Sequence, residues 1–202
     1  MSIFSIRRRT TLVAIAAMLA GAALAQTSPP RLRGMITKVS GDLVDVTTRN
    51  GSAQTLKLAP DATFFSASHA AISDITPDSF IGSAAVTQAD GTLKALEVTV
   101  FPPGLKPGEG HYPWDLGEKS TMTNGTVGDL VVSNGRTITV RYADGEKKIM
   151  VPMDAPVVRV EVGDRGLLVP GAHFLFFLKQ DAKGGQVIGN GVIGKGDVVP
   201  PM

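Results

Sequence analysis

The stretch VVSNGRTITVRYADGEKKIMV, residues 131–151, decides the fold class of this chain. Apolar side chains recur at every second position around Ile138 and Val140, which is the period of a β-strand with one buried face. The dipeptides Asn134-Gly135 and Asp144-Gly145 bracket that run, and both favour the positive φ angles of two-residue hairpin turns. The sequence therefore predicts antiparallel strands joined by tight turns.

The same pattern occurs earlier in the chain, and the two occurrences align as a repeat. Four alternating apolar positions of the first half match four of the second: Leu43, Val46, Leu56 and Leu58 correspond to Ile138, Val140, Ile149 and Val151. From Asp61 onward the offset is constant at 93 residues, so that Asp61 matches Asp154 and Pro77 matches Pro170. An ordered set of matches with turns in register indicates an internal duplication.

Each half contains about five short strands, and a small antiparallel meander loses its exposed edges most simply by closing into a barrel. We therefore predict an all-β protein of two tandem small OB-like antiparallel β-barrels. The first barrel repeat is expected over residues 26–100 and the second over 124–195, with a linker over 101–123 and a C-terminal tail over 196–202. A short helix or turn is expected within residues 68–75, with Asp74 or Asp78 as its cap.

The first unit resembles a family of small exported bacterial barrel domains of unknown function. The matching residues are Arg33, Gly34, Ile36, Asp61 to Thr63, Asp90-Gly91-Thr92-Leu93, Ala95 and Val98. The second unit has Gly184-Gly185-Gln186 where that family has Asp-Gly-Thr. The resemblance implies an OB-like fold and supplies no activity. The linker and tail also resemble exported proteins often labelled metal-transporter permeases, although a permease needs several spans and this chain has none after residue 25.

The N-terminus has the pattern of a secretory signal peptide. Arg7 to Arg9 precede an apolar run from Leu12 to Leu24, and small residues at Ala23 and Ala25 predict cleavage after residue 25. Removing the three arginines leaves 17 basic and 18 acidic residues, so the exported chain is near neutrality. Such a chain lacks the basic surface that binding to nucleic acid requires. We expect a periplasmic protein with no stable membrane insertion after signal cleavage.

The linker contains the most unusual residues of the chain. Within GEGHYPWDLG, residues 108–117, the only Trp of the protein lies three positions after a His. His111, Tyr112, Trp114 and Asp115 are therefore the candidate ligand-binding or partner-binding residues, because Trp and Tyr are frequent anchors of interfaces. The alternative is that Tyr112 and Trp114 bury their rings between the two barrels as a structural clasp.

No enzymatic motif is present, and the chain has no cysteine. The three histidines lie far apart and form no recognised metal-binding or catalytic spacing, so no catalytic residue is predicted. Soft copper ligands remain available, because His111 and Met122 lie on the same linker. We expect an exported, non-catalytic binding or accessory module of the cell envelope, with an envelope protein or a glycan as partner and no cofactor. The alternative is a periplasmic copper-type protein that uses His111 and Met122.

Overall fold

A computed structural model describes residues 30–131 and 136–200, and this part of the chain is all-β. Its strands are β1 (Arg31–Ser40), β2 (Leu43–Thr48), β3 (Ala53–His69), β4 (Phe80–Thr87), β5 (Leu93–Ala95), β6 (Val98–Val100), β7 (Gly110–Pro113), β8 (Ser120–Val131), β9 (Thr137–Tyr142), β10 (Gly145–Met150), β11 (Val157–Gly163), β12 (His173–Gln180) and β13 (Gln186–Gly194). Two short 3-10 turns, η1 (Ile72–Asp74) and η2 (Arg165–Leu167), follow β3 and β11.

Five of these strands close into a barrel, in the order β3, β2, β1, β12, β13 and back to β3. The neighbours are antiparallel except at the closing pair, where β13 runs parallel to β3. The inward-facing residues form one apolar core, whose largest members are Phe64, Phe174 and Phe176. These strands and this core confirm the all-β, barrel-forming class that the alternating pattern predicts.

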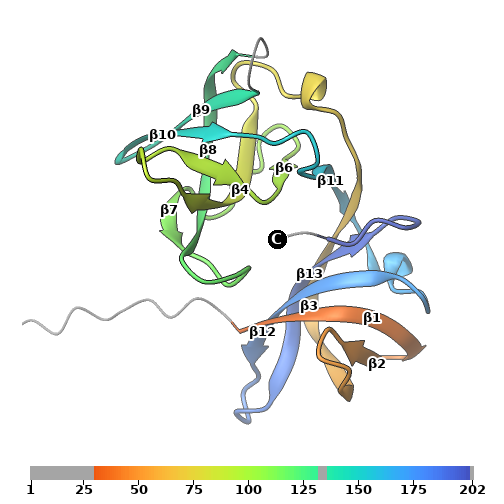
Figure 1. Cartoon of the computed structure of the whole chain (residues 1–202). Coiled ribbons are helices and arrows are strands. Elements are labelled where there is room, and N and C mark those ends of the chain that lie inside the picture. The colour runs from red at the N-terminus through yellow and green to blue at the C-terminus, as the bar shows by residue number, and fades with distance from the viewer. Residues whose placement is uncertain (1–29, 132–135, 201–202) are drawn as a thin grey trace, which may run out of the picture.

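The barrel does not follow the predicted domain boundaries. It combines three strands from the range 26–100 with two strands from the range 124–195, whereas two tandem barrels would each use neighbouring strands. The physical reason lies in β3, which is a continuous strand of 17 residues. Figure 1 shows that β3 runs out of the barrel and carries the chain to the other side of the molecule before β4 begins.

The strands on that other side also pair in a cycle, from β4 through β5, β10, β9 and β8 back to β4. We call these five strands the second sheet. Their registers resemble those of the barrel, and the corresponding partners are 93 residues apart except for Gly34 and Gly125, which are 91 residues apart. Phe174 pairs with Gly34 in the barrel and Ile81 pairs with Gly125 in the second sheet; likewise Val187 pairs with Lys57, and Lys94 pairs with Met150.

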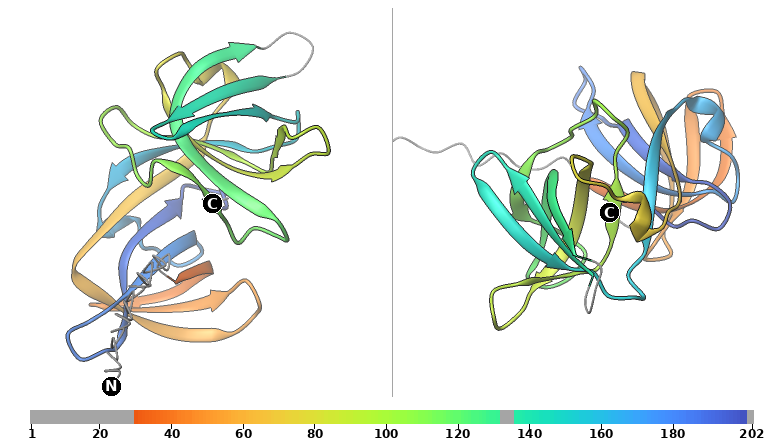
Figure 2. Two further views of the ribbon diagram at one scale, coloured as in Figure 1. Left: turned by 90° about the vertical axis from the view of Figure 1, so that its left-hand side faces the viewer. Right: turned by 90° about the horizontal axis from the view of Figure 1, so that it is seen from above.

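The barrel and the second sheet meet where β3 pairs with β11. Ala67 and Val160 pair at the middle of this contact, and they are themselves 93 positions apart. A third apolar cluster fills the junction, with buried residues from both sides and from the chain after β13, where Val198 is buried. Figures 1 and 2 show the two parts stacked around this junction.

The predicted turn at Asp144-Gly145 is present, and Gly145 has a positive φ angle of 149°, whereas Asn134-Gly135 lies outside the described residues. Four further turns contain Gly41, Gly51, Gly91 and Gly184, with positive φ angles between 59° and 85°. The predicted turn within residues 68–75 is η1, and its Asp74 carboxylate accepts a hydrogen bond from the Ala71 N–H.

The structure differs from the alternating pattern at Leu43, and it places a strand in the expected linker. Leu43 is 47% exposed because it lies at the start of β2, so that Val44 takes the buried position that corresponds to Ile138. The first strand of the second half begins at Ser120, inside the predicted linker, because Ser120 already pairs with Val86.

The predicted signal peptide, residues 1–25, lies outside the described residues. In residues 30–131 and 136–200, no helix has the length and apolar character needed to cross a membrane.

Candidate functional site

The linker forms a strand and a closed loop beside the second sheet. Its strand β7 pairs with the first residues of β8, so that His111 lies opposite Thr123 and Tyr112 opposite Met122. Two hydrogen bonds close the loop that follows. The backbone N–H of Trp114 donates to the Ser120 carbonyl over 2.8 Å, and the Ser120 hydroxyl donates to the Trp114 carbonyl over 3.0 Å. These bonds hold Trp114 and Asp115 at a fixed position above the junction.

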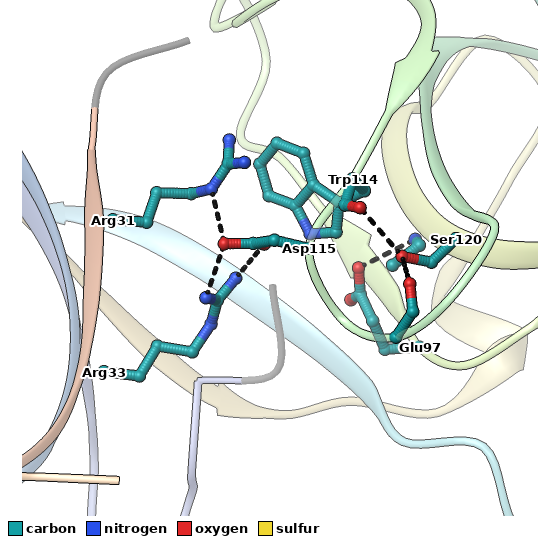
Figure 3. A network of polar contacts seen from close by, with 8 residues as sticks. Arg31, Arg33, Glu97, Trp114, Asp115 and Ser120 are labelled. Carbon is teal, nitrogen blue, oxygen red and sulfur yellow. Dashed lines mark hydrogen bonds and ion pairs between the residues drawn. The ribbon is translucent and has the colours of Figure 1, made fainter. Parts of the chain in front are cut away.

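Asp115 is bound by two arginines from the start of β1 (Figure 3). Arg33 donates two parallel hydrogen bonds, at 2.8 and 3.0 Å, and Arg31 Nε donates a third at 3.0 Å. Both arginine side chains are about nine-tenths buried, whereas the Asp115 side chain is 40% exposed. Desolvation alone raises the pKa of Asp115, but the hydrogen bonds and charges of Arg33 and Arg31 outweigh it and lower that pKa. Asp115 is therefore held as a carboxylate that ties the linker to the barrel.

The aromatic rings of the linker pack into the same junction. The Arg31 guanidinium lies 3.8 Å from the centre of the Trp114 ring, and the Tyr112 and Trp114 rings meet edge to face with centroids 6.0 Å apart. Both rings belong to the junction cluster, together with Leu116. The Trp114 indole Nε1 is buried without a hydrogen-bond partner among the described residues. This packing has the geometry of the clasp alternative.

The Asn124 side chain holds the part of the linker that precedes β7. Its Nδ2 donates to the carbonyls of Pro107 and Gly108 and to the Tyr112 hydroxyl, at 2.9 to 3.1 Å. Burial raises the pKa of Tyr112, so that its hydroxyl stays protonated at neutral pH. The hydroxyl and the amide thus order the turn that precedes β7.

The structure does not bring the two candidate metal ligands together. Successive residues of a strand point to opposite faces, so His111 and Met122 lie on opposite faces of the β7–β8 pair. His111 Nδ1 lies 2.8 Å from the Thr123 hydroxyl and its ring stacks on Tyr142, whereas Met122 is buried in the junction. Burial, and then the charge of Lys147, lowers the pKa of His111. Residues 30–131 and 136–200 contain no group of three or more His, Asp or Glu placed to hold a metal ion.

The other two histidines lie elsewhere. His69 ends β3, and its Nε2 lies 3.3 Å from an Asp197 carboxylate oxygen at the exposed surface. His173 begins β12 and pairs with Met35 on β1. Neither is near His111, so the histidines form no common site.

Sequence reasoning missed Arg31 and Glu97. Glu97 lies between β5 and β6 and is fully buried. Its Oε1 accepts from the Ala84 N–H and its Oε2 from the Thr99 hydroxyl, both over 3.0 Å. Desolvation raises the pKa of Glu97 to about 7, although these bonds and the charge of Arg33 act in the opposite direction. The available signal was one acid directly between the apolar residues Leu96 and Val98.

A groove with a volume of about 550 Å³ lies beside the linker, at the edge of the junction. Its lining includes Phe80, Phe101, Pro102 and Pro103. The rim carries charges of both signs, since Lys106 Nζ lies 5.9 Å above the Phe80 ring and Arg159 lies 3.4 Å from Asp74. Residues 101–104 and 106 of the linker belong to its lining.

Comparison with known protein families, with curated proteins and with solved structures finds no match for this chain.

Proposed function

We propose that this protein is an exported, non-catalytic binding or accessory module of the cell envelope. The observation that carries the proposal is the engagement of Asp115. Its two oxygens accept three hydrogen bonds from Arg31 and Arg33, so most of its lone pairs are occupied and its charge is compensated. A carboxylate held in this way serves to position the linker, whereas a general base needs an oxygen that can take up a proton.

Two OB-like barrels from a duplication form part of the same proposal. The support is that the barrel and the second sheet have matching strand registers, as an approximate twofold axis between Ala67 and Val160 would require. The first half then contributes β1, β2 and β3 to the barrel and β4 and β5 to the second sheet. The second half contributes β8, β9 and β10 to the second sheet and β12 and β13 to the barrel. Such an exchange joins the two sheets permanently and creates a junction that a single barrel would lack.

The proposed binding surface is the groove between the linker and the second sheet. Exposed prolines beside phenyl rings suit an extended polypeptide segment, because prolines keep the backbone of the groove wall rigid and the rings bury apolar side chains. The rim has Asp74, Asp78 and Glu161 as well as Lys106 and Arg159, and this balance does not favour a polyanion. We therefore propose a segment of an envelope protein as the occupant.

Site-directed photo-crosslinking tests this assignment. A photoreactive residue is placed at Pro103 in the groove wall, and the control position is Asn50, which is exposed at a hairpin turn of the barrel. We expect one polypeptide adduct at position 103 in an envelope extract, with none at position 50 and a loss of that adduct when Lys106→Glu changes the rim. A protease-resistant carbohydrate adduct at position 103 would identify a glycan partner instead. Equal adducts at both positions, or an adduct insensitive to Lys106→Glu, would contradict the groove assignment.

Cell fractionation tests the export part. We expect a periplasmic protein whose N-terminal residue is Gln26, because the signal pattern predicts cleavage after Ala25. A cytoplasmic protein that retains residues 1–25 would contradict it.

A further inference from the structure

The junction contains a second carboxylate that the clasp does not use. Among the described residues Glu97 is the one charged side chain that is fully buried, and it lies close enough to Arg33 for the two charges to interact. Figure 3 shows Glu97 below Trp114, whereas Arg31 and Arg33 lie on the other side of Asp115 in this view. A buried acid whose charge interacts with that of a bound arginine can compete for the arginine when it loses its proton.

The groups that face Glu97 come from four elements. Ala84 of β4 donates its N–H, Thr99 of β6 donates its hydroxyl, and the charge comes from Arg33 of β1. The linker adds Asp115, which holds Arg33 through two hydrogen bonds. With Glu97 neutral the network has two arginines and one carboxylate, whereas with Glu97 ionised it has two of each.

We propose that the proton on Glu97 controls how tightly the clasp holds the linker to the barrel. The neutral acid leaves Arg33 bound to Asp115 by its two parallel bonds. The ionised acid is a buried charge that needs a partner, so it draws Arg33 away from Asp115 and brings water into the junction. The loop that contains Trp114 then loosens, because Arg33 supplies two of the three bonds that hold Asp115.

Two further observations agree with this assignment. The pKa of Glu97 is raised to about 7 by burial, so the change of state falls in the neutral range. The buried Trp114 Nε1 has no hydrogen-bond partner among the described residues, and water that enters the junction would satisfy it. The inference concerns the junction alone and does not depend on what the groove binds.

Fluorescence of Trp114 tests the proposal directly, because it is the only Trp of the protein. Emission maximum and quenching by neutral acrylamide are measured on the full mature chain from pH 5 to pH 9. We expect a red shift and increased quenching in one step, with a midpoint of about 7. No step in this range would overturn the proposal.

Three variants assign the step to Glu97. Glu97→Gln keeps an oxygen that accepts from Ala84 but has no proton to lose, so its fluorescence should stay blue and flat. Glu109→Gln, an exposed change on the linker, should retain the wild-type step. His111→Gln should also retain it, which separates Glu97 from the nearest titrating imidazole. A step of unchanged midpoint in Glu97→Gln, or its loss in His111→Gln, would overturn the proposal.

A further variant covers the case in which Glu97→Gln does not fold. Asp115→Asn removes the competing negative charge, so Arg33 becomes available to Glu97 and stabilises its ionised form. The midpoint in Asp115→Asn should therefore move to lower pH. An unchanged or higher midpoint would show that the two carboxylates do not share Arg33.

Discussion

The barrel and the second sheet have the same strand pairing but different interiors. Where the barrel has Phe174 and Phe176, the equivalent positions of the second sheet have Ile81 and Ser83. The Ser83 hydroxyl donates over 2.7 Å to the backbone carbonyl of Glu97, so a polar group fills space that a phenyl ring fills in the barrel. Strand pairing therefore depends on alternation and turns, while the interior can change from aromatic to aliphatic, with one buried serine, without altering the registers.

Truncating the barrel core should have the largest effect. Phe176→Ala removes a fully buried ring that is stacked on Phe174, and should lower the free energy of unfolding by about 3–5 kcal/mol. The matched change in the second sheet, Ser83→Ala, removes one hydrogen bond and should lower it by about 1 kcal/mol. Chemical denaturation measures both. Equal losses would mean that the two interiors are not energetically different.

The second prediction concerns the pH dependence of stability and rests on Glu97, whose position in the barrel half is taken by an uncharged residue. The pKa of Glu97 is about 7 in the folded protein against 4.5 as its ordinary value, so the folded state holds the proton more tightly. This tighter proton binding stabilises the folded state fully below pH 4.5. The stabilisation is lost as the pH rises to 7, which lowers the free energy of unfolding by about 3 kcal/mol in total. His111, whose pKa is lowered, acts in the opposite direction, so the measurement is the difference between wild type and Glu97→Gln.

The prediction is tested by how the difference in free energy of unfolding between wild type and Glu97→Gln changes with pH. Stability of the wild type relative to Glu97→Gln should fall between pH 4.5 and 7 and then stay level. The equivalent residue of the barrel is Asn190, which does not titrate, so Asn190→Gln should leave the slope unchanged. A relative stability that rises with pH would contradict a raised pKa for Glu97.

Two glycines should show that the pairing, unlike the interior, is the same in both parts. A Cβ on Gly34 would overlap the Thr47 carbonyl oxygen, and a Cβ on Gly125 would overlap the Arg141 carbonyl oxygen. Gly34→Ala and Gly125→Ala should each lower the free energy of unfolding by about 1–3 kcal/mol. Gly185→Ala is the control, because its Cβ would make an ordinary contact at 3.4 Å. A large loss at only one of the two strand glycines would break the equivalence.

The smallest effects should come from ion pairs. Asp115→Asn weakens the clasp but affects a side chain that is 40% exposed, so we expect a loss of about 1 kcal/mol in the free energy of unfolding. Asp61→Asn removes an exposed pair with Lys179 on the outside of the barrel and should give no measurable change. An effect of Asp61→Asn as large as that of Asp115→Asn would remove the distinction between junction and surface.

The strands, their turns and the 93-residue offset could be predicted from the sequence, because each depends on residues that are close along the chain. The exchange of strands could not. The same alternating residues of β12 can bury one face against β1 or against β8, and nothing in their pattern specifies which copy supplies the partner.

The candidate site was predicted in part. Tyr112, Trp114 and Asp115 do lie together, because they are neighbours in sequence and their rings need burial. Arg31 and Arg33 could not be identified as their partners, since they lie 84 and 82 residues from Asp115. His111 and Met122 appeared close in sequence, but the period of two along paired strands places them on opposite faces.

The exchange of strands also determines the order in which this protein can fold. The barrel begins with β1 and is closed by β13, the last strand in chain order, so no part of it is complete while a ribosome or an export channel still holds the end of the chain. Pairing such distant segments makes folding slow and cooperative, because the entropy of closing the chain is lost before the barrel core forms. A chain shortened by its last two strands should therefore lose the barrel at its beginning.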